Sequence, residues 1–501
     1  MSSRHSVPIR GLMSTGTSPS FQGRFGRMFR SLSGAKFGKD EKENVINLAA
    51  LGDAMSADFD KPFDGPDPEE SGIPALYTYL AQFIDHDITF DPASSLQQQN
   101  DPDALIDFRT PAFDLDNVYG RGPDDQPYMY EGKSFLLGDP IQGGDPNAKH
   151  LARNNANPRR ALIGDPRNDE NTIVSQLQGL FLRFHNRLLA DTGLPFETVQ
   201  RLVRFHYQFI VLNDFLPRIV HSSVLTDLKK DGQYDSGKLK FFHWKSDPFM
   251  PVEFSVAAYR LGHSMIRPGY RLNDNDLTLL PIFPVPDQGL PNGLTGFQAM
   301  DPIRGIDWGR FIDINIRKYD GTDEEKKKRL QFAYRIDTSL VNPLHKLPPS
   351  VASNPSSLAQ RNLERAWRLG LPSGQSVARA MHVQPLKDEE ILIGKATTDE
   401  VDPKLKSIVK VSKVFANNCP LWTYILAEAM HFSESVKIPV VEDVSIVAPR
   451  LGPVGGRIVA EVFLGLMFGD AHSLLRLDPE WHPEQGEDFA LKDFVKYALG
   501  Q

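Results

Sequence analysis

The chain has 501 residues, and its 56 lysines and arginines against 64 aspartates and glutamates give a formal net charge of −8. A chain of this length folds as two domains or as one unusually large domain, whose core is large enough to enclose a cofactor. The net acidity gives no electrostatic basis for nucleic-acid binding. The single cysteine, Cys419, excludes an intramolecular disulfide framework.

Residues 1–45 are expected to form a basic N-terminal arm, flexible or strap-like. From Met1 to Lys39 there are seven lysines and arginines and no acidic residue or continuous apolar run, which argues against a secretory signal and leaves a transit peptide as the alternative. The apolar stretch 454–475 contains three charged residues, so we expect a core helix there and not a membrane span. By default this predicts a cytoplasmic location, with non-classical export as the alternative.

Residues 46–501 are predicted to form one large domain, because no linker and no fixed-period repeat divides them. Strand-like alternation is scarce, whereas apolar residues recur three and four apart in many segments. The predicted fold class is therefore mainly α, with long structured loops and very little β. The expected helices cover residues 74–86, 171–192, 197–221, 252–266, 322–334, 357–369, 402–415, 420–430 and 455–467.

Four segments combine residue types that carry chemistry. The first ends the helix predicted at 74–86, where Gln82, Asp85 and His86 are spaced three and four apart and so share one helical face. A polar face beside apolar neighbours needs a partner inside the fold. The alternative is a solvated helix end in which Asp87 acts as a cap.

The second segment, residues 110–120, carries Thr110, Asp114 and Asp116 at alternate positions before a glycine. Their oxygens suit a hard cation that takes six to eight oxygen ligands. Asp87 would add another anionic ligand from the neighbouring helix. An Asx-type turn explains this segment equally well.

The third segment precedes the long helix predicted at 171–192. Capping accounts for Asn168 and Asp169, but it does not account for Arg167, because an arginine at the positive end of a helix needs an anion or a carboxylate partner. In the fourth segment Arg260, His263 and Arg267 are expected to lie on one helical face. A histidine flanked by two arginines in this way is typical of an axial haem ligand with propionate-binding neighbours, although a lone histidine would more often be a core residue.

These segments, in this order, resemble the animal-type haem peroxidases of the peroxidase–cyclooxygenase superfamily, over about residues 51–475. The chain length and the lack of a secretory signal and of disulfides are more similar to a bacterial member. The resemblance implies a single-domain haem peroxidase that reduces hydrogen peroxide to water through a ferryl intermediate while it oxidises small phenolic or halide donors.

The resemblance also implies residue roles. His86 matches the distal acid–base histidine, Arg167 the distal arginine, and Gln82 the residue that orients water or halide. His263 matches the proximal iron ligand, Asn362 its hydrogen-bond partner, and Arg260 a propionate-binding arginine. Asp85 and Glu170 match the carboxylates that form ester links to the haem, so covalent attachment of a haem b-derived group is expected. The matching calcium ligands are the side chains of Asp87, Thr110, Asp114 and Asp116 and the backbone carbonyl of Ala112.

Three alternatives are weighed against a peroxidase. A fatty-acid dioxygenase or cyclooxygenase on the same scaffold needs a tyrosine three residues before the proximal histidine, but this position is Arg260, with Tyr259 one residue earlier. A haem- and calcium-binding adhesion scaffold does not need the full set of His86, Arg167, His263 and Asn362. A metal-dependent phosphohydrolase needs further histidine and aspartate ligands at helical spacing.

Overall fold

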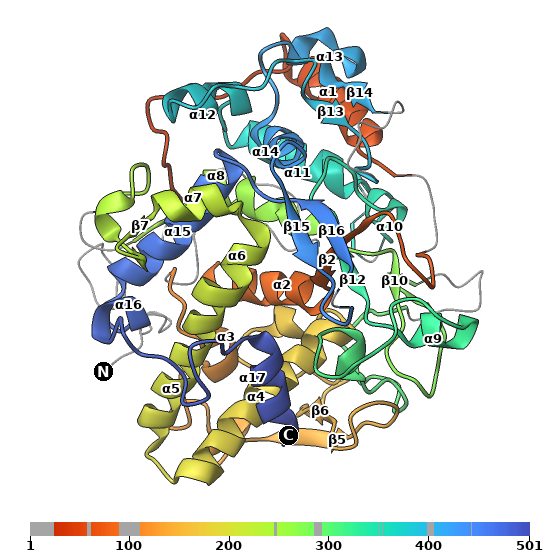
Figure 1. Ribbon diagram of the computed structural model, residues 1–501, viewed down its shortest axis with the longest axis vertical. Coiled ribbons are helices and arrows are strands. Elements are labelled where there is room, and N and C mark those ends of the chain that lie inside the picture. Colours follow the sequence, from red (N-terminus) through yellow and green to blue (C-terminus); the bar gives the residue numbers. More distant parts are fainter. Residues whose placement is uncertain are drawn as a thin grey trace.

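The computed structural model describes residues 25–57, 62–89, 111–244, 248–284, 293–349, 351–352, 354–397, 405–441 and 443–501. Helices dominate the regular structure (Figure 1), which confirms the predicted mainly α class. The α-helices are α1 Glu41–Ala54, α2 Leu76–Ile88, α3 Asp116–Tyr119, α4 Thr172–Thr192, α5 Phe196–Ile210, α6 Leu216–Ile219, α7 Ser222–Asp227, α8 Val252–Ser255, α9 Asp323–Lys328, α10 Asn342–His345, α11 Leu358–Arg368, α12 Gly374–Ala380, α13 Ile408–Val411, α14 Leu421–Ala429, α15 Gly455–Gly469, α16 Leu474–Leu477 and α17 Leu491–Leu499.

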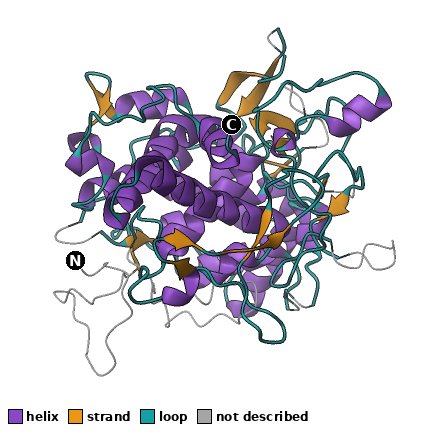
Figure 2. Cartoon of the chain, turned by 90° about the horizontal axis from the view of Figure 1, so that it is seen from below, coloured by secondary structure: helices purple, strands orange, loops and turns teal. Residues whose placement is uncertain are grey.

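The strands are short, and within the described residues they form two-stranded sheets only (Figure 2). All of these pairs are antiparallel except β1 with β9. The strands are β1 Phe25–Gly26, β2 Glu70–Pro74, β3 Tyr130–Glu131, β4 Ser134–Phe135, β5 Leu137–Pro140, β6 Lys149–Leu151, β7 Lys229–Lys230, β8 Gln233–Tyr234, β9 Met250–Pro251, β10 Gly269–Tyr270, β11 Leu280–Pro281, β12 Phe332–Tyr334, β13 Leu392–Ile393, β14 Lys406–Ser407, β15 Ser433–Lys437 and β16 Ser445–Pro449.

Helix α4 is the element against which α2, α5 and α17 pack (Figure 1). Its N-terminus is capped by Asn171, whose side-chain oxygen accepts from the backbone N–H groups of Ile173 and Val174 at 3.0 and 2.9 Å. It ends at Gly193, which has a left-handed φ of 62°. Both ends of this 21-residue helix are therefore fixed by its own sequence.

One large apolar cluster joins α2, α4, α5, α14 and α15. Helix α15 is buried along most of its length, as expected for a core helix, and its charges are paired. Arg457 Nε lies 2.6 Å from Glu461 Oε1, and the Glu461 carboxylate accepts from the backbone N–H groups of residues 240–242. Within the described part of the chain, no helix has the length and apolar character needed to cross a membrane.

The single helix predicted over 252–266 is wrong. The chain forms α8 and then a separate 3-10 helix, η5, at Ala258–His263. At the break, Arg260 Nε donates to the Ser255 carbonyl at 2.9 Å, and Ala257 has non-helical backbone angles. Arg267 lies beyond η5, and its Nη1 pairs with Oε1 of the buried Glu70 at 2.7 Å. It does not share a helical face with Arg260 and His263.

Two other predicted helices are partly wrong because strand pairing overrides their helical periodicity. In the segment 322–334 only α9 is helical, and β12 pairs with β2. In the segment 402–415 the described part begins with β14, which pairs with β13, before the short helix α13 and a 3-10 turn. The predicted helix 197–221 does form, but it contains a π-helical turn at Val211–Phe215 between α5 and α6.

The predicted N-terminal arm is described only from residue 25 onward. Strand β1 pairs with β9, and Phe29 and Phe37 are buried in the core. The backbone N–H groups of Met28 and Phe29 donate to the Glu253 carboxylate at 3.1 and 3.2 Å. Residues 25–37 therefore lie against the domain as a strap, and the division at residues 45 and 46 stays a prediction.

Candidate active site

Helix α2 presents a polar face inside an otherwise apolar environment. All of its residues are buried except Gln82 and Asp85, which are half-buried. Because these two are three residues apart and His86 follows Asp85, the three side chains share the predicted face. The helix is enclosed along its apolar faces and less tightly covered along this polar face.

His86 is held by a chain of amide side chains. Its Nδ1 lies 2.7 Å from Asn168 Oδ1, and Asn168 Nδ2 donates to Gln178 Oε1 at 2.8 Å. The Gln178 amide nitrogen in turn donates to the Asn117 carbonyl at 3.4 Å. This chain fixes the orientation of the Asn168 amide, so its oxygen accepts from a protonated Nδ1. The Nε2 atom of His86 is then the unprotonated nitrogen.

Burial makes His86 a neutral base. Together with the nearby Arg167 cation, burial lowers the pKa of His86 to about 4, against the opposing effects of Asp165 and Asp85. At neutral pH the imidazole is therefore uncharged and its Nε2 lone pair is available to accept a proton.

Arg167 lies in the 3-10 helix η2 (Pro166–Asp169) and holds the last turn of α2. Its Nη2 donates to the carbonyls of His86 and Thr89 at 3.0 and 2.5 Å. The same guanidinium pairs with Asp165, whose Oδ2 lies 2.7 Å from Nη2 and whose side chain is fully buried. The carboxylate partner that the sequence required for Arg167 is thus Asp165, and the cation also faces the negative end of the α2 dipole.

Gln82 connects α2 to the start of α4. Its Nε2 donates to the Glu170 carboxylate, and its Oε1 accepts from Asn171 Nδ2 at 3.1 Å. Burial raises the pKa of Glu170 to about 7; Arg167 opposes this rise, and Asp165 and Asp85 add to it. Glu170 therefore carries a proton over part of the neutral pH range.

His263 ends η5, and Asn362 of α11 reaches it. The Asn362 amide nitrogen lies 2.8 Å from His263 Nδ1. Burial and the nearby Arg260 lower the pKa of His263 to about 3, so the ring is neutral. In this orientation Asn362 donates to the ring, whereas the opposite amide orientation presents oxygen to a protonated Nδ1 and leaves Nε2 free to bind a metal.

Gly262 borders open space beside His263. A Cβ atom built at Gly262 meets no atom within 4 Å, although half of the residues of η5 are buried. A flat group can therefore approach the backbone at this position. The chain thus leaves room for a planar group at Gly262, next to His263.

The segments carrying His86 and His263 share one electrostatic environment. Helix α2 contacts η5, and the charge on Asp85 acts on Arg260 of η5 and on Arg365 of α11. Burial lowers the pKa of both arginines, to about 10 for Arg365, and Asp85 opposes this. Two desolvated cations near His263 suit an anionic ligand.

Three carboxylates converge at the end of α2. Ligand oxygens of Asp87, Asp114 and Asp116 all lie within 4.8 Å of one another, and Asp87 and Asp116 are buried. Like charges this close repel strongly in a buried site, and a cation relieves the repulsion. Ala112 is buried in the same segment. The predicted ligand Thr110 lies outside the described residues.

Three other residues of this site were only partly predictable from their sequence positions. Asn168 matched a helix cap, yet it orients His86. Asp165, which carries the partner charge of Arg167, is two residues before it. Arg365 follows Asn362 by three residues, so the helical periodicity of 357–369 places both on one face.

Residues 93–287 match the model of the animal haem peroxidase family. Thyroid peroxidase of Canis lupus familiaris is 29% identical over 160 residues, 29% of this chain and 16% of that protein. Peroxidasin of Drosophila melanogaster is 23% identical over 258 residues, 49% of this chain and 15% of that protein. The matches thus span less than a fifth of the length of these curated relatives.

Solved structures show the same fold over almost the whole chain. Peroxidase A from Dictyostelium discoideum superposes with a TM-score of 0.61 at 17% identity, covering 95% of this chain and 93% of that one. A fatty acid alpha-dioxygenase of Arabidopsis thaliana gives 0.54 at 14% identity, covering 95% and 77%. Residues 93–287 of the chain are thus similar to the animal haem peroxidases, and the predicted single-domain peroxidase-like fold is confirmed.

The space beside Gly262 gives a test that separates folding from haem binding. In the apoprotein, Gly262→Ala should keep the free energy of unfolding or raise it by up to about 1 kcal/mol, because the methyl group meets no atom and the unfolded chain loses entropy. The same methyl group should weaken haem binding at least about tenfold, or about 1.4 kcal/mol. Urea denaturation and titration of the Soret band measure the two effects.

Gly465→Ala is the matched control. A Cβ atom at Gly465 would overlap the Phe242 ring in the α15 core, so this variant should lose apoprotein stability. Unchanged haem affinity in Gly262→Ala would show that haem does not approach η5 here.

Proposed function

We propose that this protein is a haem peroxidase that reduces hydrogen peroxide to water and oxidises small phenolic or halide donors. The observation that carries the proposal is the neutral His86, with Nδ1 held by Asn168 and Nε2 directed away from that bond. The family match and the fold support it. Haem would supply the iron that binds peroxide and the electrons that break its O–O bond.

The residues around His86 have separate roles: His86 transfers a proton, and Arg167 stabilises charge. His86 Nε2 takes a proton from one oxygen of hydrogen peroxide and gives it to the other oxygen, which then leaves as water. Arg167 is tied to Asp165 and to the end of α2, so its cation is fixed before the reaction, and it favours negative charge developing nearby. Gln82 positions water or halide beside His86.

His263 of η5 would bind the haem iron through Nε2. This requires Asn362 to turn its amide oxygen toward Nδ1–H, a half-turn of the amide that fixes the tautomer and raises ligand basicity. Arg260 is the proposed partner of a haem propionate. Bacterial origin and a cytoplasmic location stay predictions, and a role in the response to oxidative stress is part of the proposal.

The fatty-acid oxygenase is the second candidate, and the Arabidopsis structure shows that this fold hosts such enzymes. Tyr259 is the nearest tyrosine to His263 along η5, and its ring stacks on Phe254 with centroids 4.8 Å apart. A fatty-acid oxygenase needs a tyrosine three residues before His263, and this position is Arg260. The residue present therefore favours the peroxidase. Oxygen uptake with linoleate distinguishes the two enzymes, and guaiacol turnover distinguishes a peroxidase from an adhesion scaffold.

Two substitutions test the roles of the histidines. His86→Leu should keep the Soret band and lower the rate of guaiacol oxidation by about 10² to 10⁴-fold, because it removes only the base. His263→Ala should change the Soret position and the electron paramagnetic resonance signal of the iron, because it removes the ligand. The exposed His472→Gln is the control and should match the wild type. A His86→Leu variant with full activity would exclude the proposed base.

Covalent attachment is proposed to use Asp85 and Glu170, the carboxyl groups on the α2 and α4 sides of the site. After turnover with peroxide, acidified acetone should leave haem on the wild-type protein. Asp85→Asn and Glu170→Gln should each remove one ester bond, and the double variant should release all haem. Mass spectrometry of haem peptides measures the links. Complete release from the wild type would exclude the esters and leave the peroxidase intact.

The carboxylate cluster of Asp87, Asp114 and Asp116 is proposed to bind Ca²⁺, with Thr110 and the Ala112 carbonyl as further ligands. Calcium at a hundred times its dissociation constant should raise the free energy of unfolding by about 2.7 kcal/mol. Asp114→Asn should lose most of this gain, since it removes one charged ligand, and the exposed Asp488→Asn should retain it. Thermal unfolding with calcium or with a chelator measures the difference, and equal behaviour of the two variants would exclude the site.

A further inference from the structure

Aromatic rings form a continuous series that begins on α2. Phe83, next to Gln82, stacks on Phe181 of α4 with centroids 4.3 Å apart and planes 9° apart. Phe181 contacts Phe494 of α17 at 4.6 Å. The first ring of this series therefore belongs to the helix that carries His86.

The series then turns back to α4 and reaches the surface. Phe494 stacks on Phe184 at 4.2 Å and 13°, and Phe184 lies 4.9 Å from the ring of Tyr497. The phenylalanines are buried, whereas Tyr497 is half-buried. Packing alone explains stacked phenylalanines in a core. It does not explain why the series ends at a surface hydroxyl with a charged partner.

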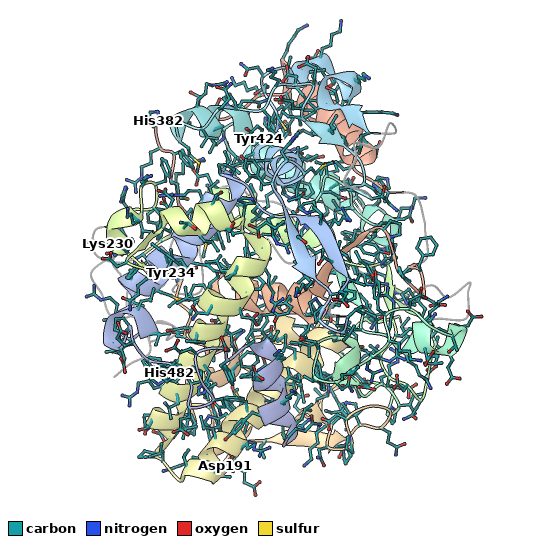
Figure 3. All side chains as sticks on the ribbon, viewed as in Figure 1. Asp191, Lys230, Tyr234, His382, Tyr424 and His482 are labelled. Carbon is teal, nitrogen blue, oxygen red and sulfur yellow. The ribbon has the colours of Figure 1, made fainter. Side chains whose placement is uncertain are left out.

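The hydroxyl of Tyr497 has a proton acceptor. It donates to Asp191 Oδ2 at 2.7 Å, and the Asp191 side chain is half exposed at the lower end of α4 (Figure 3). The hydrogen bond from Tyr497 lowers the pKa of Asp191, and Arg187 lowers it further. The carboxylate is therefore ionised at neutral pH. The Arg187 guanidinium lies 4.8 Å from the Tyr497 ring.

We propose that Tyr497 is a second oxidation site, at which phenols attached to macromolecules lose one electron each at the protein surface. The proposal rests on the proposed peroxidase function, because hydrogen peroxide at the interior site supplies the oxidising equivalents. The close-packed phenylalanine rings form an electron path from Tyr497 to α2. A donor carried on a large molecule needs such a path because His86, the proposed base on the polar face of α2, is buried.

The reaction balances in electrons and protons. One hydrogen peroxide takes up two electrons and two protons and becomes two waters. Each electron leaves the Tyr497 ring, and the hydroxyl proton passes to Asp191 and then to solvent. The resulting tyrosyl radical takes a hydrogen atom from the phenolic O–H of the donor, which restores Tyr497. Two donor molecules are thus converted to two phenoxyl radicals for each peroxide.

The experiment uses haem-loaded full-length protein, hydrogen peroxide, and a nitroso spin trap with peptide mass spectrometry. The wild type should carry the trap at Tyr497. Tyr497→Phe keeps the packing and should lose this adduct, and it should oxidise phenol coupled to dextran at least tenfold more slowly. Tyr497→Trp should restore an adduct at residue 497, because it restores an oxidisable ring. Tyr128→Phe is the control: Tyr128 is 53% exposed, and its ring contacts no other aromatic ring in the part of the chain described.

Asp191 is tested as a positioning residue. Asp191→Asn should weaken the adduct at Tyr497, because it removes the carboxylate that accepts the hydroxyl proton, whereas Asp191→Glu should retain the adduct. If the wild type carries no adduct at Tyr497, or if Tyr497→Phe oxidises dextran-phenol at the wild-type rate, the surface site is excluded. Free guaiacol separates the two proposals: its oxidation without an adduct refutes the surface site alone, and no peroxide consumption refutes the peroxidase.

Discussion

The hydrogen bond between His86 Nδ1 and Asn168 is the interaction on which the site depends. It joins α2 to the segment before α4, and the same segment holds α2 again through Arg167 and the carbonyls of the last turn. The position of the base and its tautomer are therefore set by one short stretch of chain. A buried imidazole without this partner would have no fixed proton position, and burial would still lower its pKa.

Burial also explains why so many charges around α2 are paired. Arg167 is balanced by Asp165, and Gln82 donates to Glu170. At Arg260 and Arg365 burial outweighs the effect of Asp85 and lowers the pKa of both. A cation thus lies near each histidine, Arg167 near His86 and Arg260 near His263, and both imidazoles are neutral. An anionic planar cofactor matches this distribution of charge.

Spacing along helices made the polar face of α2 predictable from sequence, since Gln82, Asp85 and His86 need only a regular helix to come together. The convergence of Asp114 and Asp116 with Asp87 agrees with the predicted grouping of alternate residues, although the backbone there is not extended: Leu115 has a left-handed φ of 59° and Asp116 begins α3. Predictions failed where tertiary pairing decides local structure. The Arg260 side chain takes the Ser255 carbonyl, and Phe332–Tyr334 pairs with β2 in place of a helix. The amide chain behind His86 was also hidden, because no spacing rule joins Asn117 to Gln178.

Three residues near the end of α2 contact three different neighbours. His86 faces Asn168, the next residue Asp87 faces the carboxylate cluster, and Phe83 stacks on α4. Tyr207 connects the carboxylate cluster with Phe83. Burial and the charge of Asp87 raise the pKa of Tyr207, and the Tyr207 ring lies 6.2 Å from the Phe83 ring. A shift of α2 therefore changes the base, the cation site and the first aromatic contact together. Tyr497 is at the far end of the aromatic series, so we expect substitutions there to leave α2 in place. The interior site and the surface tyrosine can therefore be changed separately, although α2 carries both His86 and the first ring of the series.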